Sequence, residues 1–312
     1  MGKYLLKTLL MTIPTFLGVL TIVFFLIHLT PGDPAMSILG PNATAEAIQE
    51  LRKSLGLDQP LYVQYLNYLG RVARGDLGRS LATEQPVLLE TLRPFPYTIH
   101  LALAGVLVAL IVGIPIGVIS AVRRNTLLDY IARATSISGI SIPVFFLAII
   151  FLWIFSYQLR WFPVIGVGNT SSWRSLLHHL ILPGMTLGIS LGVLIMRVTR
   201  SCMLEVLGQD YVRTARAKGL GENAVIMVHA LKNTLLPIVT VVGLYIGQLL
   251  GGAILTETVF ARQGVGKLLM DAIFDRDYPQ VQGTILIFAC AVILVNVIVD
   301  IIYRFLDPRI KL

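Results

Sequence analysis

Six long stretches without a charged residue constrain this chain more than any other feature of its sequence. Each contains 22 to 26 residues and no Asp, Glu, Lys or Arg. At about 1.5 Å of rise per residue, a helix of that length spans the roughly 30 Å hydrocarbon core of a bilayer. Transmembrane strands need only about ten residues of alternating polarity, a pattern that these stretches lack. The sequence therefore predicts an all-α polytopic membrane protein with six transmembrane helices, at residues 9–30, 98–122, 134–159, 175–196, 233–256 and 278–299.

Composition and charge argue against two other classes of protein. Hydrophobic residues make up 55% of the chain and charged residues 13%, which is too apolar for a soluble enzyme. The formal net charge of +8 has a simpler cause than nucleic-acid binding. If the N-terminus is cytoplasmic and six helices alternate, the cytoplasmic segments hold 14 basic and five acidic residues, whereas the outer segments balance. The positive-inside rule therefore predicts that both termini are cytoplasmic, with no nucleic acid as partner.

The segment 31–97 is predicted to lie outside and is polar enough to fold in water. It reads as two short helices with capping signals at both ends. Thr44 can cap the first, which Gly56 can end, and Asp58 can cap the second, which stops before Gly75. This external segment is either a lid on the outer helix ends or a docking surface for an external protein, and both interpretations stay open.

The rest of the chain divides on either side of this segment. Residues 1–30 are the N-terminus and the first helix, which has no cleavage pattern and is expected to be retained. Residues 98–312 form a core of five helices, whose largest cytoplasmic connection is 197–232. Cys202 and Cys290 fall at the end and in the middle of predicted helices, so we expect no disulfide framework.

Glycines recur every four residues on three of the predicted helices. Small residues at this spacing let helix backbones approach closely, which is a main source of association energy within lipid. We interpret them as packing positions: Gly113 and Gly117 on the second helix, Gly184, Gly188 and Gly192 on the fourth, and Gly243, Gly247 and Gly251 on the fifth. Three prolines, Pro115, Pro143 and Pro183, are expected to interrupt helices.

The predicted spans lack a site for a coupling ion. An ion-coupled transporter usually keeps an Asp, Glu or Lys near mid-membrane, and none of the six stretches contains one. Residues 264–268 resemble a phosphate loop only weakly, because Ala261 replaces its first glycine and Leu268 its Ser or Thr. Uphill transport would therefore need energy from another polypeptide. An ion-coupled secondary transporter or a channel is the alternative, since backbone carbonyls can also bind sodium.

The connection 197–232 reads as a helix, a glycine turn and a second helix. Gly219 and Gly221 form the turn, and Glu222 opens the second helix. Apolar residues fall roughly along one face of this pair, and Arg and Lys surround them. The pair either fits a socket on a partner protein or lies as an amphipathic helix on lipid headgroups.

At these residues the sequence resembles a known family. Residues 210–220 (Asp-Tyr-Val-Arg-Thr-Ala-Arg-Ala-Lys-Gly-Leu) and 229–237 (His-Ala-Leu-Lys-Asn-Thr-Leu-Leu-Pro) are similar to the cytoplasmic coupling loop of ABC-importer permeases. The similarity is to the dipeptide, oligopeptide and nickel group of that family. It continues in the same order over nearly the whole chain, at residues 30–34, 55–60, 75–78, 257–260, 276–279 and 307–309.

The resemblance implies an ABC type I importer permease fold in the bacterial cytoplasmic (inner) membrane. It also implies four kinds of partner: a second homologous permease, two cytoplasmic ATPases that bind ATP and Mg, an external substrate-binding protein that is periplasmic or lipid-anchored, and membrane lipid. The chain itself would hold no cofactor or metal and catalyse no reaction. With the second permease it would form the translocation pathway for di- or oligopeptides or a related small solute.

The resemblance also assigns residues to ATPase coupling. In the wider family the loop reads Glu-Ala-Ala, three residues and Gly; aligned on Gly219, those positions are Arg213, Thr214 and Ala215. The acid of the motif is missing there, and Asp210 would supply it one turn earlier. The implied coupling residues are Asp210, Tyr211, Arg213, Thr214, Ala215, Arg216, Ala217, Lys218, Gly219, Leu220 and Glu222.

Polar residues inside the predicted spans are the candidates for the pathway. Tyr245, Gln248 and Asn296 need partners in an apolar setting, which either a water-filled pathway or interhelical hydrogen bonds can supply. His178 and His179 lie near the outer interface. Adjacent residues point to different faces of a helix, so we do not expect these two histidines to share a metal.

Overall fold

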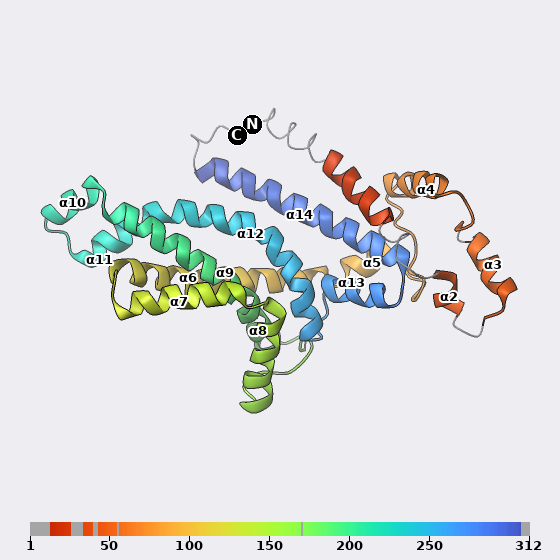
Figure 1. Cartoon of the computed structure of the whole chain (residues 1–312), viewed down its shortest axis with the longest axis horizontal. Coiled ribbons are helices and arrows are strands. Elements are labelled where there is room, and N and C mark those ends of the chain that lie inside the picture. The colour runs from red at the N-terminus through yellow and green to blue at the C-terminus, as the bar shows by residue number, and fades with distance from the viewer. Residues whose placement is uncertain (1–12, 26–33, 40–42, 55, 170, 307–312) are drawn as a thin grey trace. The chain divides into compact units, whose positions relative to one another are not determined.

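The structure is a computed structural model that describes residues 13–25, 34–39, 43–54, 56–169 and 171–306. Within these residues the regular elements are helices, and the one strand-like pairing is an isolated bridge between Arg79 and Pro86 (Figure 1). Four helical runs are long and apolar enough to cross a bilayer: Val87–Val122, Trp173–Leu207, Glu222–Val259 and Tyr278–Val299. The helices Ile13–Phe25 and Val144–Gln158 are apolar but shorter. The predicted first span, 9–30, lies partly outside the described residues.

The chain divides into two compact units. Unit 1 contains Met1–Pro96 and Gly264–Val297, and unit 2 contains Tyr97–Gln263 and Ile298–Leu312. In unit 1 the helices are Ile13–Phe25, α2 (Pro34–Leu39), α3 (Ala45–Ser54), α4 (Leu61–Ala73), α5 (Val87–Leu92), α13 (Val265–Phe274) and most of α14 (Tyr278–Leu306). In unit 2 they are α6 (Phe95–Val122), which begins at the boundary, α7 (Leu127–Ser141), α8 (Val144–Phe151), the π-helix η1 (Leu152–Gln158), α9 (Trp173–Leu207), α10 (Asp210–Ala217), α11 (Glu222–Ala224), the π-helix η2 (Val225–Ala230) and α12 (Leu231–Val259).

An aromatic cluster holds unit 1 together. Phe24 of the first helix stacks on Tyr68 of α4, with ring centroids 5.8 Å apart, and both pack with Leu286 of α14. The hydroxyls of Thr21 and Tyr65 lie 2.6 Å apart beside this cluster. At the start of α14 the buried Asp277 accepts hydrogen bonds from the Ser80 hydroxyl and from two backbone amides that follow it. These contacts fix the polar segment before α5 to the start of an apolar helix.

The segment 31–97 contains more helices than the two predicted. The first predicted helix is α3, where the backbone N–H of Ala47 donates to the Thr44 hydroxyl (3.3 Å), and Gly56 follows with φ +69°. The second is α4, but its cap is Pro60, so the prediction of Asp58 as the cap was wrong. Proline fits there because its fixed φ suits the start of a helix and no amide is needed. The short helices α2 and α5 had no clear signal in the sequence.

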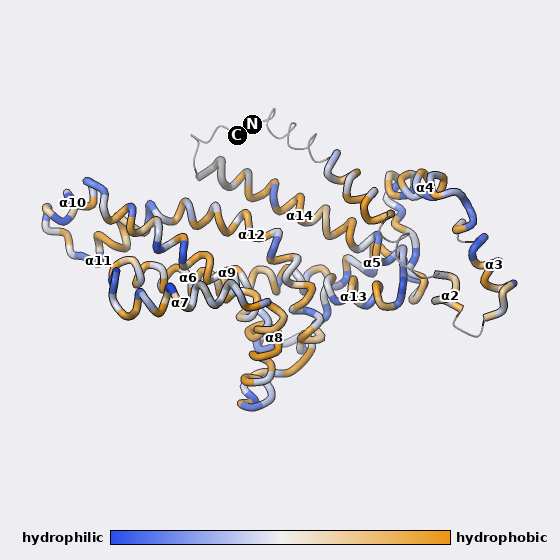
Figure 2. Tube along the Cα trace, in the orientation of Figure 1, coloured by the Kyte–Doolittle hydropathy of each residue, from blue (hydrophilic) through white to orange (hydrophobic). Residues whose placement is uncertain are grey.

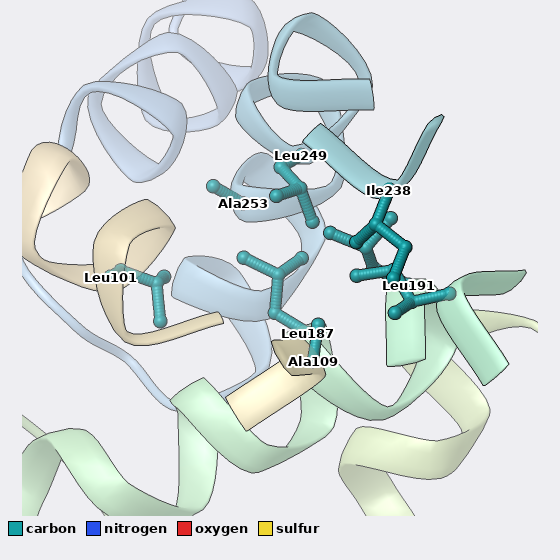
Figure 3. Close-up of a cluster of buried hydrophobic side chains, with 8 residues drawn as sticks. Leu101, Ala109, Leu187, Leu191, Ile238, Leu249 and Ala253 are labelled. Carbon is teal, nitrogen blue, oxygen red and sulfur yellow. The ribbon is translucent and has the colours of Figure 1, made fainter. Parts of the chain in front are cut away.

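The core of unit 2 lies where α6, α9 and α12 meet. Figure 3 shows Leu187 of α9 between Leu101 of α6 and Leu249 of α12, and all three are nearly or fully buried. The α6 and α9 backbones touch through their glycines. A Cβ at Gly188 would lie 2.5 Å from the carbonyl oxygen of Gly105, and one at Gly113 would lie 2.6 Å from that of Gly192. No side chain fits at either position.

The other glycine positions differ from one another. A Cβ at Gly184 would lie 2.9 Å from the Ala104 side chain, and one at Gly117 would lie 2.6 Å from Thr199. On α12 the Gly251 position is open: apart from its own helical backbone, no atom of the described residues would lie within 4 Å of a Cβ there. Gly243 is buried and Gly247 is half-buried. The α12 glycines therefore do not form one packed stripe within this chain.

The three prolines do not act alike. Helices α6 and α9 continue through Pro115 and Pro183, so the expectation that these prolines interrupt helices was wrong. At Pro143 the chain does break: Ile142 has an extended conformation (ψ 119°), and α8 begins after the proline. A residue before proline avoids the helical region, and here the backbone follows that preference. The predicted third span is therefore two helices, α7 and α8, and η1 continues the second of them.

Candidate coupling site

The helix α10 stands apart from the long apolar helices of unit 2. Helix α9 ends at Leu207, Gly208 and Gln209 make a turn, and α10 begins at Asp210. The predicted continuous helix is therefore broken directly before the first of the coupling residues, Asp210. In Figure 1, α10 and α11 lie together at one end of unit 2, away from α8, and Figure 2 shows hydrophilic residues gathered over them.

One face of α10 is packed and the other is exposed. Val212 and Ala215 are buried against Val225, with Val206 and Leu207 beside them. Of the predicted coupling residues on α10 only Ala215 is buried, and the remainder are exposed. The side chain of Asp210 is 93% accessible and that of Arg213 is 72% accessible, and the two form a loose ion pair (3.4 Å). A helix that is anchored by small apolar residues thus presents an almost entirely polar surface outward.

The turn after α10 depends on one glycine. Gly219 has φ +79°, and its N–H donates to the Arg216 carbonyl (2.9 Å). Apart from the adjoining residues, a Cβ at this position would meet no atom of the described part of the chain within 4 Å, so any penalty for a side chain is conformational rather than steric. Arg216 then makes two hydrogen bonds to the carboxylate of Glu222 (3.1 and 2.7 Å), which closes the turn from α10 to α11.

A hydrogen bond connects α10 to α12. The Tyr211 hydroxyl accepts from the Asn233 side-chain amide (2.7 Å), and the same amide nitrogen donates to the His229 carbonyl (3.1 Å). Helices α9 and α12 also meet near this end, where the buried Thr234 donates to the sulfur of Met203 (3.3 Å). Helix α10 is therefore joined to α9 by the Gly208 turn and to α12 by the hydrogen bond between Tyr211 and Asn233.

Comparison with known proteins assigns the family. The family model described as "binding-protein-dependent transport system inner membrane component" matches residues 113–312. The model of the N-terminal part of the same membrane component matches residues 1–102. The chain belongs to this family of transport permeases. It is a multi-pass protein of the inner membrane, and its relatives are permease subunits of transport systems.

Relatives in several bacteria match over their full length. The permease is 43% identical to the dipeptide transport system permease protein DppB of Alkalihalophilus pseudofirmus, over 100% of both chains. It is 45% identical to the di/tripeptide transport system permease protein DppB of Pseudomonas aeruginosa, and 43% identical to the glutathione transport system permease protein GsiC of Salmonella choleraesuis. Each of these two alignments covers 100% of this chain and 99% of the relative.

The fold matches a solved ABC transporter. An inward-facing structure of the MetNI methionine ABC transporter aligns with a TM-score of 0.59 at 19% identity, over 71% of this chain and 98% of that chain. At this identity the match establishes the ABC permease fold alone.

A buried ion pair between α7 and α9 was not predicted from the sequence. Asp129 of α7 is fully buried, and Arg200 of α9 makes two hydrogen bonds to its carboxylate (2.7 and 3.0 Å). The Ser120 hydroxyl and the backbone N–H of Asn125 donate to the same carboxylate. These bonds, chiefly that from Arg200, hold the pKa of the Asp129 carboxyl well below its usual range. The Asp129 carboxylate thus connects α6, α7 and α9 near the helix ends that the sequence assigns to the cytoplasm.

A second buried charged group lies near the opposite ends of these helices. Glu257 of α12 is fully buried and accepts a hydrogen bond from the Thr98 hydroxyl (2.6 Å). Arg262 is also buried, and its guanidinium donates to the His179 carbonyl (3.4 Å). Burial lowers the pKa of Arg262, and the nearby Glu257 carboxylate opposes that shift. Glu257 lies one residue beyond the predicted fifth span, which is why counting charges within spans overlooked it.

The three predicted pathway residues are divided between the two units, with two on α12 in unit 2 and one on α14 in unit 1. Tyr245 is half-buried against the core of unit 2, and Gln248 is exposed on the same helix. Asn296 is exposed on the part of α14 that belongs to unit 1. In the part of the permease that the structure describes, none of the three makes a side-chain hydrogen bond. Their partners are therefore not found among the described interhelical contacts.

The two adjacent histidines have separate partners. A ring nitrogen of His178 lies 2.8 Å from the Trp161 carbonyl, and one of His179 lies 2.8 Å from the Ser175 carbonyl. Their rings are nearly perpendicular. Among the described residues no group of three His, Cys, Asp or Glu side chains could hold a metal ion.

Proposed function

We propose that this permease forms one half of the translocation pathway of an ATP-driven importer for short peptides. Its proposed partners are a second homologous permease, two cytoplasmic ATPases that bind ATP and Mg, and an external binding protein that delivers the peptide. The names of the relatives support this substrate class, since dipeptides, tripeptides and glutathione are all small molecules with amide bonds and carboxylates.

The proposal places six helices across the membrane with both termini in the cytoplasm. Four described runs have the required length and hydropathy. Helix α8 continued by η1, together with the helix that contains Ile13–Phe25, would supply the other two. The excess of basic residues in the inner segments supports the orientation.

The surface of α10 is the observation that carries the proposal. Its inner face is packed against Val225 and its outer face is polar and exposed. An amphipathic helix that lies on lipid headgroups would instead direct its apolar face to the membrane. Because Val212 and Ala215 are already covered by this chain, the polar face of α10 suits a protein socket better than a lipid surface.

In the proposed cycle, α10 sits in a groove of an ATPase and moves when the two ATPases close on their nucleotides. The turn at Gly208 and the bond between Tyr211 and Asn233 carry this movement to α9 and α12. The pathway then changes the side on which it is open. A complete switch from 1:99 to 99:1 requires about a 10⁴-fold difference in nucleotide affinity between the two states. This chain itself makes and breaks no covalent bond.

Tyr245 and Gln248 are proposed to face the pathway from α12, and Asn296 from α14. The exposure of Gln248 and Asn296 on apolar helices supports this assignment, because an unpaired amide facing lipid would be costly. Water, the second permease or a passing peptide bond would satisfy these amides.

Isolation of the complex tests the proposal. The tagged chain is extracted from its native membrane in mild detergent, its partners are identified by mass spectrometry, and ATP hydrolysis is measured. We expect a second six-helix permease and one or two ATPases to co-purify with ATP-hydrolysing activity. Recovery of the chain alone, together with solute transport by that chain in liposomes, would overturn the proposal in favour of an ion-coupled transporter or a channel.

A further inference from the structure

Unit 1 contains a cavity that the coupling mechanism does not use. Its volume is about 750 Å³, and its lining comes from the helix Ile13–Phe25, α3, α4, the loops around them and the start of α14. Cavities that hold small molecules commonly measure about 300–1,000 Å³. The cavity is therefore large enough for a short peptide, and too small for a folded protein.

The charge of the lining is one-sided. Lys53 of α3, Arg71 of α4 and Arg74 just after α4 line the cavity, and no Asp or Glu is among the described residues that line it. Within the described residues none of these three side chains forms an ion pair, whereas Arg200, Arg216 and Lys267 elsewhere in the chain each have a carboxylate partner. Three unpaired cations around one cavity favour an oxyanion, and arginine in particular suits a carboxylate or a phosphate.

Amide side chains at the cavity are held in place. The Gln64 side chain donates to the Gln59 carbonyl (2.7 Å), and the Asn67 amide donates to the side-chain oxygen of Gln59 (3.3 Å). Gln282 of α14 adds a fourth amide to the lining. An amide can donate and accept at once, as a peptide bond does, whereas a phosphodiester offers acceptors only.

Aromatic rings form an apolar part of the same lining. Tyr68 is stacked on Phe24, and Tyr278 of α14 also lines the cavity. Such rings offer flat apolar area to the side chains of a small ligand.

We propose that this cavity binds a short peptide and holds its terminal carboxylate among Lys53, Arg71 and Arg74. The inference rests on the proposed function for the nature of the solute and for the placement of this segment outside the membrane. It adds to that function a second place, besides the binding protein, where the substrate is recognised. A phospholipid phosphate shares the oxyanion chemistry, but the four amides favour a ligand that contains peptide bonds.

The test measures direct binding of trialanine to the purified full-length chain in phosphatidylcholine nanodiscs, without the binding protein. Saturation-transfer NMR is used to compare trialanine with its C-terminal amide, which lacks the carboxylate. We expect the amide to bind at least about tenfold more weakly, because a charge-assisted hydrogen bond is lost. Arg71→Gln and Arg74→Gln should weaken the binding of trialanine to a similar extent.

Arg93→Gln is the matched control. It removes one positive charge from an exposed arginine of the same unit that does not line the cavity. This variant should bind trialanine as the unaltered chain does. Lys53→Gln, at the exposed end of α3, provides a third cavity variant if either arginine variant fails to fold.

Three results would overturn the proposal. The first is equal binding of trialanine and its amide, and the second is unchanged binding by Arg71→Gln and Lys53→Gln. The third is loss of trialanine binding when the nanodiscs that hold the chain also contain phosphatidylglycerol. The last result would assign the cavity to a lipid phosphate. Peptide uptake by the assembled transporter is measured on the same variants. Uptake without binding to the isolated chain overturns only the cavity proposal, whereas absence of any peptide uptake by the unaltered complex overturns the proposed function.

Discussion

At the scale of single residues, the buried carboxylate of Asp129 has the strongest set of partners in the described chain. Its four hydrogen bonds come from three elements, and its burial makes each of them difficult to replace with water. A buried carboxylate that is fully paired is tolerated, but removing one member of the pair leaves an uncompensated charge.

Asp129→Asn is therefore expected to lower the free energy of unfolding by about 3 kcal/mol, because Arg200 loses its ionic partner. The measurement is the thermal unfolding of the purified chain in detergent. Asp210→Asn serves as the control, since its ion pair is exposed and its loss should leave stability unchanged. Equal unfolding temperatures for the two variants would contradict this account.

The pH dependence follows from the direction of the pKa shift. The folded state binds the Asp129 proton less readily than the unfolded state, so the stabilisation is present at neutral pH and is lost as pH falls through the lowered pKa. Mild acid, within the usual titration range of carboxyls, should therefore not reproduce the effect of Asp129→Asn.

Two tyrosines on α4 provide a second residue-scale comparison. The hydroxyl of Tyr65 lies 2.6 Å from that of Thr21, whereas the buried hydroxyl of Tyr68 has no hydrogen-bond partner among the described residues. Burial raises the pKa of Tyr68 to about 12, which keeps this hydroxyl protonated. Tyr65→Phe should cost about 1 kcal/mol, and Tyr68→Phe should leave stability unchanged or raise it. Thermal unfolding of both variants checks this, and a larger loss for Tyr68→Phe would contradict it.

At the scale of helices, close contacts between α6 and α9 depend on glycine. Gly113→Ala should reduce stability by about 1–3 kcal/mol, because its Cβ would lie 2.6 Å from a backbone oxygen that cannot move freely. Gly251→Ala should leave the stability of the isolated chain unchanged, since the space at that position is open. Denaturation of the isolated chain compares the two. A fully stable Gly113→Ala protein would show that the α6–α9 contact is looser than described.

The turn after α10 tests the coupling role of that helix. Gly219→Val should leave the protein in the membrane but uncouple ATP hydrolysis from uptake, because valine disfavours the left-handed backbone that ends α10. Gly221→Val is the matched control: Gly221 has φ −61° and equally open space. Hydrolysis and uptake are measured for both variants in the reconstituted complex. Normal uptake by Gly219→Val would exclude the proposed role of this turn.

The sequence predicts the elements of this permease better than their contacts. Long uncharged stretches locate the apolar helices, and Thr44 and Gly56 mark the ends of α3, because these signals are local. Whether a proline breaks a helix is less local: Pro143 ends one, whereas Pro115 lies inside a helix that other helices pack against. The partner of Asp129 is 71 positions away, so no spacing in the sequence could identify it.

At the scale of the whole molecule, the two compact units have different proposed roles, ATPase coupling in unit 2 and peptide binding in unit 1. Unit 2 contains the packed helices α6, α9 and α12 and the buried Asp129–Arg200 pair. It also contains the exposed helix α10, which is the proposed site of ATPase coupling. Unit 1 contains the helices of the segment 31–97 and a cavity lined by Lys53, Arg71 and Arg74. We therefore expect substitutions at Arg71 to alter peptide affinity and substitutions at Gly219 to alter coupling.

ATP-dependent uptake in proteoliposomes is the most direct test of whether this permease belongs to an ATP-driven peptide importer. The complex that contains this chain is reconstituted with its binding protein, and labelled dialanine and trialanine are supplied outside, with ATP or ADP enclosed on the cytoplasmic side. We expect peptide to accumulate inside the proteoliposomes only when ATP, the binding protein and this permease are all present. Equal accumulation with ADP, or transport by this chain alone, would contradict it.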